Sequence, residues 1–165
     1  MCISDTGLVA KSESWASSPA ARAVMRGNRR RDTRPELAVR RLLHAAGLRY
    51  RVNMRPENGV RRTADIVFTR QRVAVFIDGC FWHGCPEHPK RAPQTNADYW
   101  SKKLAGNVAR DRETTAVLSA AGWTVLRYWE HEDASAVAGR IRRDHVGFIR
   151  RRESVLPARQ RLRNR

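Results

Sequence analysis

The most constraining feature of the sequence is the segment DGCFWHGCPEH at residues 78–88. It contains Cys80 and Cys85, His88 follows the second cysteine, and His131 lies much further along the chain in the segment WEHED. A structural zinc site takes four sulfur or nitrogen ligands in a tetrahedron, and these four side chains supply that number. Such a site would hold the cysteine segment against a distant part of the chain. The alternative is that the cysteines are free and buried and that the histidines lie on the surface.

The spacing alone leaves the ligand set open, because His83 is a fifth candidate for four positions. The chain has three cysteines, and an odd number argues against a framework of disulfide bonds. The histidine that does not bind the metal needs another explanation.

The hydrophobic pattern predicts alternating helices and strands. A capping box at Thr33 and Glu36 begins the first helix, and Gly47 ends it. Alternation of Leu48, Tyr50 and Val52 then predicts a half-buried strand. The further expected elements are a hairpin of strands at 64–68 and 73–78, a helix at 97–120, a strand at 123–130 and a helix at 134–143. This order predicts an α/β fold with a mixed sheet flanked by helices.

The 165 residues suit one domain with tails. Residues 1–18 lack periodicity and are expected to be disordered, residues 19–145 are expected to form the domain, and residues 146–165 an arginine-rich tail. The N-terminus has no apolar segment typical of a secretion signal, and no apolar run is long enough to cross a membrane. A cytoplasmic protein is therefore expected.

The charge of the chain indicates a polyanionic partner. The formal net charge is +17, and 29 of the 33 basic residues are arginine. Residues 140–165 contribute +8 of this charge, so the rest of the chain still carries +9. Nucleic acid is the usual partner of such a chain. The alternative is that the arginines only solvate the surface and the tail.

Two carboxylates are expected at one edge of the hairpin. Asp65 lies at the start of the first arm and Asp78 at the end of the second, and these positions face each other in a hairpin. Two like charges there favour a hard cation, and Mg²⁺ binds a few carboxylates together with water and phosphate oxygens. On a basic chain this indicates metal-assisted phosphodiester cleavage, with His83 as the general base for water. The alternative is that both acids cap turns.

Four large aromatic residues are expected in or near the cysteine segment at residues 78–88. Phe81 and Trp82 are adjacent and cannot both face one core from a strand, whereas Tyr99 and Trp100 begin the long helix. In a metal-held basic segment such side chains can wedge between bases. Core packing fits the same pattern, and the sequence does not decide between the two.

Several segments resemble the very-short-patch-repair (Vsr) family of DNA mismatch endonucleases, namely ADIVF, VFIDGCFWHGCPEH, YWSKKLAGNVARDR and GWTVLRYWEHE. The segment NRRRDTRPELAVRRLLHAAGLRYRV is similar to the N-terminal part of these enzymes, so the resemblance covers about residues 17–145. It implies a restriction-endonuclease-like fold of the PD-(D/E)xK type with a structural zinc ion. The implied activity is Mg²⁺-dependent nicking of one DNA strand beside a T:G mismatch, which arises when 5-methylcytosine deaminates.

The resemblance also implies roles for single residues. Asp65 would be the principal Mg²⁺ ligand with the backbone carbonyl of Ile77, His83 would be the base, and Glu36 falls where the family has an active-site acid. The implied zinc ligands are Cys80, Cys85, His88 and His131. The residues implied to contact DNA are the intercalating aromatics Phe81, Trp82 and Trp100, a wedge at Met25, and Lys103 and Asn107, which would face the mismatched bases.

The chain departs from the best-known members at two points. Asp78 stands where they have a histidine that acts near the phosphate, and an ionised aspartate cannot donate a hydrogen bond there, although it can bind a metal. The zinc segment also differs, because Cys85 and His88 form its second ligand pair and His131 replaces a cysteine.

Two other functions fit the same residues. One is a restriction-type or defence nuclease of the same fold that acts on matched DNA, and the other is a zinc-stabilised DNA-binding protein without catalysis. The favoured function predicts a monomer that acts on double-stranded DNA at the nucleoid, with other repair proteins as candidate partners.

Overall fold

The computed structural model describes residues 31–88 and 96–155, and the surroundings of side chains are described as far as residue 144. Met25, the segment 1–18 and the last ten residues of the predicted tail therefore lie outside the described residues. The described elements are α2 (Arg34–Ala45), β1 (Arg51–Met54), β2 (Ala64–Phe68), β3 (Val73–Asp78), α3 (Cys80–His83), α4 (Ala97–Ala120), β4 (Thr124–Trp129) and α5 (Ala134–Val155).

The four strands form one mixed sheet in the order β1-β2-β3-β4. β1 pairs antiparallel with β2, and β2 pairs antiparallel with β3 in the predicted hairpin. β3 and β4 are parallel, and such a pair needs a crossover connection, which here contains α3 and α4. The predicted α/β class with a mixed sheet is confirmed.

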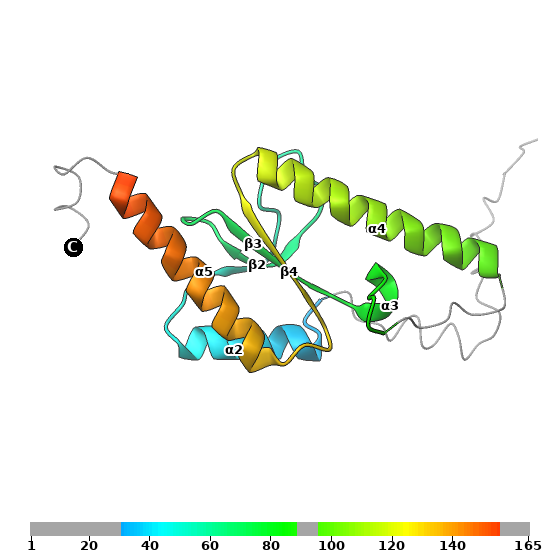
Figure 1. Ribbon diagram of the computed structural model, residues 1–165, viewed down its shortest axis with the longest axis horizontal. Helices are drawn as coiled ribbons and strands as arrows, with labels where there is room; N and C mark the ends of the chain where they lie inside the picture. The colour runs from blue at the N-terminus through cyan, green and yellow to red at the C-terminus, as the bar shows by residue number, and fades with distance from the viewer. Residues whose placement is uncertain (1–30, 89–95, 156–165) are drawn as a thin grey trace, which may run out of the picture. The chain divides into compact units, whose positions relative to one another are not determined.

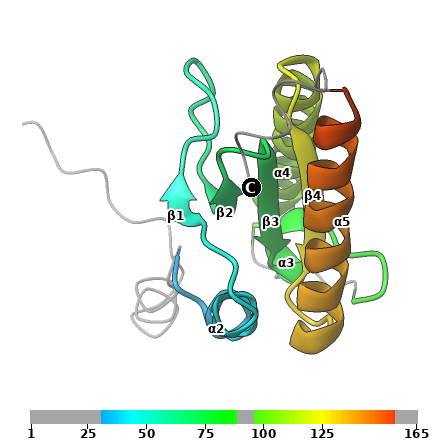
Figure 2. The ribbon, with the colours of Figure 1, turned by 90° about the vertical axis from the view of Figure 1, so that its left-hand side faces the viewer.

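Helices cover both faces of this sheet (Figures 1 and 2). On one face α2 and α5 bury an apolar core against the strands, which includes Leu43, Ile66, Val75 and Ile141. On the other face Leu118 of α4 packs with a second cluster from the sheet. Alternate residues of β3 therefore face different helices, and those on the side of Phe76 face α4.

The first and last strands begin later than predicted because of how the preceding helices end. After α2, Gly47 adopts a φ of 81°, and the Leu48 N–H donates to the Leu43 carbonyl. After α4, Gly122 adopts a φ of 80°, and the Trp123 N–H donates to the Leu118 carbonyl. This is the Schellman arrangement. It uses Leu48 and Trp123 to close helices, so strand pairing starts only after them.

The predicted capping box at the start of α2 is wrong in its bonds. The Thr33 side chain makes no hydrogen bond to the backbone of the helix and instead donates to Glu36 at 2.8 Å. The second Glu36 oxygen accepts the Asp32 N–H at 2.9 Å and pairs with Arg40 at 2.9 Å. Glu36 is only 3% exposed, so water cannot stabilise its charge as it would at a surface cap. The positive charge of Arg40 stabilises it instead.

Two further differences concern helices. No helix is predicted between the strand at 73–78 and the helix at 97–120, but residues 80–83 form one helical turn, α3, which Gly84 ends in the left-handed conformation. α5 was predicted to end at Arg143 and instead continues to Val155. Arginine is a good helix former and the next proline is Pro157, so charge alone does not end this helix. Among the described residues, no helix has the length and apolar character needed to span a membrane.

Candidate active site and metal centre

The strand directions bring the predicted acids to one end of the sheet. β3 runs antiparallel to β2 and parallel to β4, so the start of β2 lies beside the ends of β3 and β4. Asp65 is the second residue of β2, whereas Asp78 is the last of β3 and pairs with Trp129 of β4. The charge of Asp78 raises the pKa of Asp65. The two carboxylates therefore lie close enough to interact, as expected.

Asp65 occupies a position that opposes its own ionisation. Its pKa is raised to about 7, first by burial and then by the charges of Glu36 and Asp78, while the Ile77 N–H acts in the opposite direction. That N–H donates to the Asp65 carboxylate at 2.7 Å, beyond the last paired residues of the hairpin. A divalent cation beside Asp65 would offset this repulsion.

Glu36 lies close enough to Asp65 to act on it through charge. Its own carboxylate is held by Arg40, which also donates to the backbone carbonyl of Asp65 at 3.1 Å. Arg40 in addition pairs with Asp32 at 2.5 Å. Glu36 and Arg40 therefore join the start of α2 to the start of β2 beside the site.

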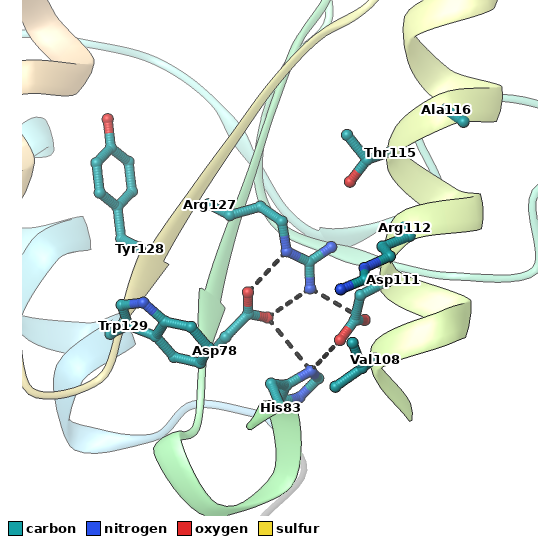
Figure 3. Close-up of a pocket in the computed structure, with 10 residues that line it drawn as sticks. All are labelled: Asp78, His83, Val108, Asp111, Arg112, Thr115, Ala116, Arg127, Tyr128 and Trp129. Carbon is teal, nitrogen blue, oxygen red and sulfur yellow. Dashed lines mark hydrogen bonds and ion pairs between the residues drawn. The ribbon is translucent and has the colours of Figure 1, made fainter. Parts of the chain in front are cut away.

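Asp78 belongs to a network of four charged or titratable side chains that Figure 3 shows between the sheet and α4. Both of its oxygens accept hydrogen bonds from Arg127, from Nε and Nη2, each at 2.7 Å. Arg127 Nη2 also lies 3.0 Å from Asp111 of α4. The Nδ1 atom of His83 lies 2.5 Å from Asp111 and 3.7 Å from Asp78.

This network sets the orientation of His83. A carboxylate only accepts hydrogen bonds, so the short contact with Asp111 assigns the proton of the neutral ring to Nδ1. Nε2 is then the nitrogen with a lone pair, which is the requirement for taking a proton from water. A buried or half-buried carboxylate behind a histidine also stabilises the cation that forms when the ring accepts a proton.

Sequence reasoning missed Asp111 and Arg127. Asp111 follows Asn107 by one helical turn, and this spacing puts both side chains on the face of α4 that meets α3. Arg127 pairs with Phe76 in the parallel register and therefore shares a face of the sheet with Asp78. The helical spacing was visible in the sequence, whereas the parallel register was not.

The network borders an open cavity of about 440 Å³. It lies between the ends of β3 and β4, the turn of α3 and the middle of α4. Its lining residues are Asp78, His83, Val108, Asp111, Arg112, Thr115, Ala116, Arg127, Tyr128 and Trp129 (Figure 3).

The four predicted zinc ligands come together. The donor atoms of Cys80, Cys85, His88 and His131 all lie within 4.8 Å of one another. Sγ of Cys80 is 3.1 Å from Nδ1 of His131, and Sγ of Cys85 is 3.8 Å from the same atom. Two sulfurs and two imidazole nitrogens form the donor set of a tetrahedral Cys₂His₂ site. The fifth candidate ligand, His83, is not part of this group, because its side chain contacts Asp111 instead.

The neighbours of this group suit a metal centre. Burial and the adjacent Cys85 raise the pKa of Cys80 to about 11, so a nearby cation is needed to hold Cys80 as a thiolate. Nε2 of His131 lies 3.2 Å from Glu87, so a carboxylate faces the nitrogen opposite the one that meets the sulfurs. The Cys80 N–H donates to Glu130 at 2.8 Å, which ties α3 to the end of β4.

The aromatic residues form a separate cluster where α3 meets α4. Phe81 packs edge-on against Trp82 at 4.9 Å between ring centroids and against Trp100 at 5.6 Å. Trp100 is 8% exposed, whereas Phe81 and Trp82 are half-buried and Tyr99 is 39% exposed. None of these residues belongs to either core cluster of the sheet. The cluster is therefore a partly exposed aromatic surface beside the candidate active site.

Lys103 and Asn107 hold this surface in place. The ammonium group of Lys103 lies 5.4–5.5 Å from the ring centroids of Trp82, Tyr99 and Trp100. The side-chain amide of Asn107 donates to the carbonyl of Trp82 at 2.9 Å. α4 thus carries the aromatic cluster at its start and Asp111 further along the same helix.

Comparison with known proteins agrees with this geometry. Residues 17–88 match the family model described as DNA mismatch endonuclease Vsr. The type II nicking enzyme V.NaeI of Lentzea aerocolonigenes is 55% identical over 111 residues, which cover 66% of this chain and 66% of the relative, just under two thirds of its length. The type II nicking enzyme V.XorIIP of Xanthomonas oryzae pv. oryzae is 42% identical over 123 residues, 73% of this chain and 88% of the relative.

A third relative is the DNA mismatch endonuclease Vsr of Escherichia coli, which is 35% identical over 106 residues, 64% of this chain and 66% of the relative. The family match at residues 17–88 includes α2, the strands β1 to β3 and the cysteine segment with α3. From the family match and the identity across these relatives, the chain belongs to the Vsr family of DNA mismatch endonucleases.

Proposed function

We propose that this protein is a Mg²⁺-dependent endonuclease that nicks one strand of duplex DNA beside a T:G mismatch. The observation that carries the proposal is that Asp78 links the two parts of the site. It lies 3.7 Å from His83, which Asp111 orients, and its charge acts on the buried carboxylate of Asp65. The mixed sheet with site residues at one end supports a restriction-endonuclease-like fold.

The Asp65 carboxylate and the Ile77 carbonyl would hold Mg²⁺, with Glu36 as a further negative charge beside it. When bound, this ion stabilises negative charge on the phosphate oxygens and favours hydroxide over water. His83 takes the proton of the attacking water at Nε2, and Asp111 stabilises the resulting imidazolium. Attack on phosphorus breaks the bond to the 3′-oxygen, which takes a proton from solvent, and leaves a 5′-phosphate and a 3′-hydroxyl.

Asp78 has a different part in this proposal from that of its counterpart in the best-known relatives. Because Arg127 engages both of its oxygens, Asp78 acts first as the anchor of Arg127 and as a negative charge near His83 and Asp65. It remains a candidate metal ligand only if Arg127 releases one oxygen.

Zn²⁺ is the metal that best suits Cys80, Cys85, His88 and His131. It would fix the turn of α3, and with it His83 and the aromatic surface, against the end of β4. The hydrogen bond from the Cys80 N–H to Glu130 already holds α3 against the end of β4 in the same way.

The aromatic surface is proposed to enter the DNA at the mismatch. Phe81, Trp82 and Trp100 can give up their contacts with each other and stack on bases instead. Opening the duplex costs less free energy at a mispaired step than at a matched one. Lys103 and Asn107 would then meet the displaced bases, and Met25 is proposed as the wedge from the opposite groove. The proposed working form is a cytoplasmic monomer on DNA.

The test compares nicking by the parent enzyme with three variants, Asp65→Ala, His83→Ala and Asp111→Asn, on T:G duplex with Mg²⁺. Loss of the metal ligand or base is expected to lower the nicking rate at least about 100-fold, and loss of the Asp111 charge somewhat less. Glu113→Gln is the matched control, because Glu113 is an exposed acid on the same helix. Full activity of Asp65→Ala and His83→Ala would contradict the mechanism.

Two other outcomes are informative about the substrate. Two similar proteins are named type II nicking enzymes, so a nickase with a different substrate is the second candidate. Cleavage of matched duplex would assign the protein to a restriction or defence function. Tight DNA binding with no cleavage in any metal would assign it to a non-catalytic role.

A further inference from the structure

Arg127 has one hydrogen-bonding nitrogen that its protein contacts do not use. Nε and Nη2 bind Asp78 and Asp111, whereas Nη1 is buried and has no hydrogen-bond partner among the described residues. The guanidinium also stacks over the ring of Phe76 at 4.8 Å. Two carboxylates and one ring therefore fix the group and leave one donor unmet.

This donor differs from the comparable nitrogens elsewhere in the described part of the chain. Arg40, Arg72 and Arg140 also have a buried nitrogen without a partner, but in each case it is Nε, close to the side-chain stem. None of these three residues lines either of the two described cavities. Arg127 lines the active-site cavity, and Figure 3 shows its guanidinium reaching from β4 towards α4 across that space.

The surroundings of the cavity favour an anionic oxygen as the missing partner. Both nearby carboxylates already engage the other nitrogens of Arg127, and the exposed Arg112 adds a second positive charge at the lining. His83, the proposed base, borders the same cavity. In an enzyme that cleaves DNA, the anionic group brought next to the base is the phosphodiester that is cut.

We propose that Arg127 binds a non-bridging oxygen of the phosphodiester at the cleavage site through Nη1, and that Asp78 serves this contact by holding the guanidinium. The inference rests on the proposed function and adds a substrate-binding residue to it. It also accounts for an aspartate at position 78, because the donor to phosphate comes from Arg127 while the aspartate anchors it.

The arrangement predicts a larger effect on catalysis than on binding. Asp78 and Asp111 offset the charge of Arg127, so it contributes little long-range attraction to DNA. As negative charge grows on the phosphate oxygens, however, a donor that is already fixed gains strength without reorganisation. Removing it is therefore expected to slow nicking about 100-fold to 1,000-fold, as for other fixed donors to a developing oxyanion.

The experiment uses Arg127→Gln and Arg127→Lys, with Arg72→Gln as the matched control. Arg72 likewise pairs with a carboxylate, Glu57, and lies over an aromatic ring, Trp123, but it does not line the cavity. Nicking rates at saturating enzyme and thermal unfolding are measured for all of them. Lysine keeps the charge but not the fork that bridges Asp78 and the phosphate, so it is expected to restore only part of the rate.

A second measurement separates contact from positioning. Binding is measured without added Mg²⁺ to two T:G duplexes, one natural and one with an uncharged methylphosphonate at the position where the parent enzyme nicks. The parent is expected to lose about tenfold in affinity for the uncharged duplex, as for the loss of a hydrogen bond between charged groups. Arg127→Gln is expected to bind both duplexes equally, and Arg72→Gln to behave like the parent.

Equal discrimination by Arg127→Gln and the parent would overturn the inference, even if the variant nicks slowly, because a positioning role leaves the phosphate contact intact. Nicking by Arg127→Gln at the parent rate would overturn it as well. A parent enzyme that nicks no substrate would instead overturn the proposed function, and the inference with it.

Discussion

At the scale of single residues, Asp65 links proton binding to stability. Its pKa is raised to about 7 from an ordinary value of 3.8, so the folded chain holds this proton more tightly than the unfolded chain does. The contribution to stability is complete below the unfolded pKa and is lost as the pH rises through the folded pKa. In the absence of Mg²⁺, Asp65 therefore destabilises the protein progressively from acidic to neutral pH.

The Asp65→Asn variant tests this link. Asparagine keeps an oxygen acceptor for the Ile77 N–H but does not ionise, so the variant should unfold at a higher temperature than the parent at about pH 8. The difference should shrink towards about pH 5, where the folded parent is mostly protonated. Calorimetry of both proteins without added Mg²⁺ makes the comparison, and a difference independent of pH would contradict the electrostatic cause.

The residues of the site divide by how far their partners lie along the chain. The placement of Asp65, Asp78 and His83 at one end of the sheet was predictable, because a hairpin and one short segment carry them. Asp111 and Arg127 were not, because their roles depend on the packing of α4 and on the parallel register of β3 and β4. The bonds of Glu36 were not predictable either, because they depend on its burial. The buried carboxylate forms an ion pair with Arg40 in place of the predicted capping box.

At the scale of elements, α3 depends on the left-handed residue that ends it. Gly84 has a φ of 68°, and a Cβ atom there would lie 3.3 Å from Cγ2 of Val108 on α4. Alanine therefore meets both backbone strain of about 1–2 kcal/mol and a tight contact with the neighbouring helix. Because α3 carries His83 and two aromatic residues, a shift of this turn reaches the site.

Gly84→Ala is expected to lower both the stability of the protein and its nicking rate. Gly59→Ala is the control, because Gly59 has a φ of 89° but open space around its Cβ position. The two variants share the strain, and only Gly84→Ala displaces α3. Thermal unfolding and nicking rates of both decide the matter, and equal nicking rates would show that the contact with Val108 does not control the position of His83.

The elements themselves were largely predictable from hydrophobic pattern and turn residues. The bounds of β2, β3 and α4 agree with the prediction, because alternating or periodic apolar residues stand between clear turn signals. β1 and β4 begin later because the Schellman bonds use Leu48 and Trp123. The four residues of α3 have no periodicity to detect, and the length of α5 depends on arginines that fit a helix as well as a tail.

At the scale of the whole molecule, the four-ligand group joins the cysteine segment to the residue that follows β4. The protein is expected to contain one zinc ion per chain by elemental analysis. Cys85→Ala should lose the metal and unfold at a markedly lower temperature, because the thiolate and histidine ligands would no longer be held together. His83→Ala is the control within the same segment and should retain the zinc. A Cys85→Ala variant that keeps one zinc ion would contradict the ligand set.

The most direct test of the account is a nicking assay with Mg²⁺ on duplexes that differ only in one base pair, T:G or matched, in varied flanking sequences. The parent enzyme is expected to make a single-strand break beside the T:G pair only when Mg²⁺ is present, and Asp65→Ala is expected to make none. Cleavage of matched DNA at the same rate, or T:G nicking that persists in Asp65→Ala, would contradict it.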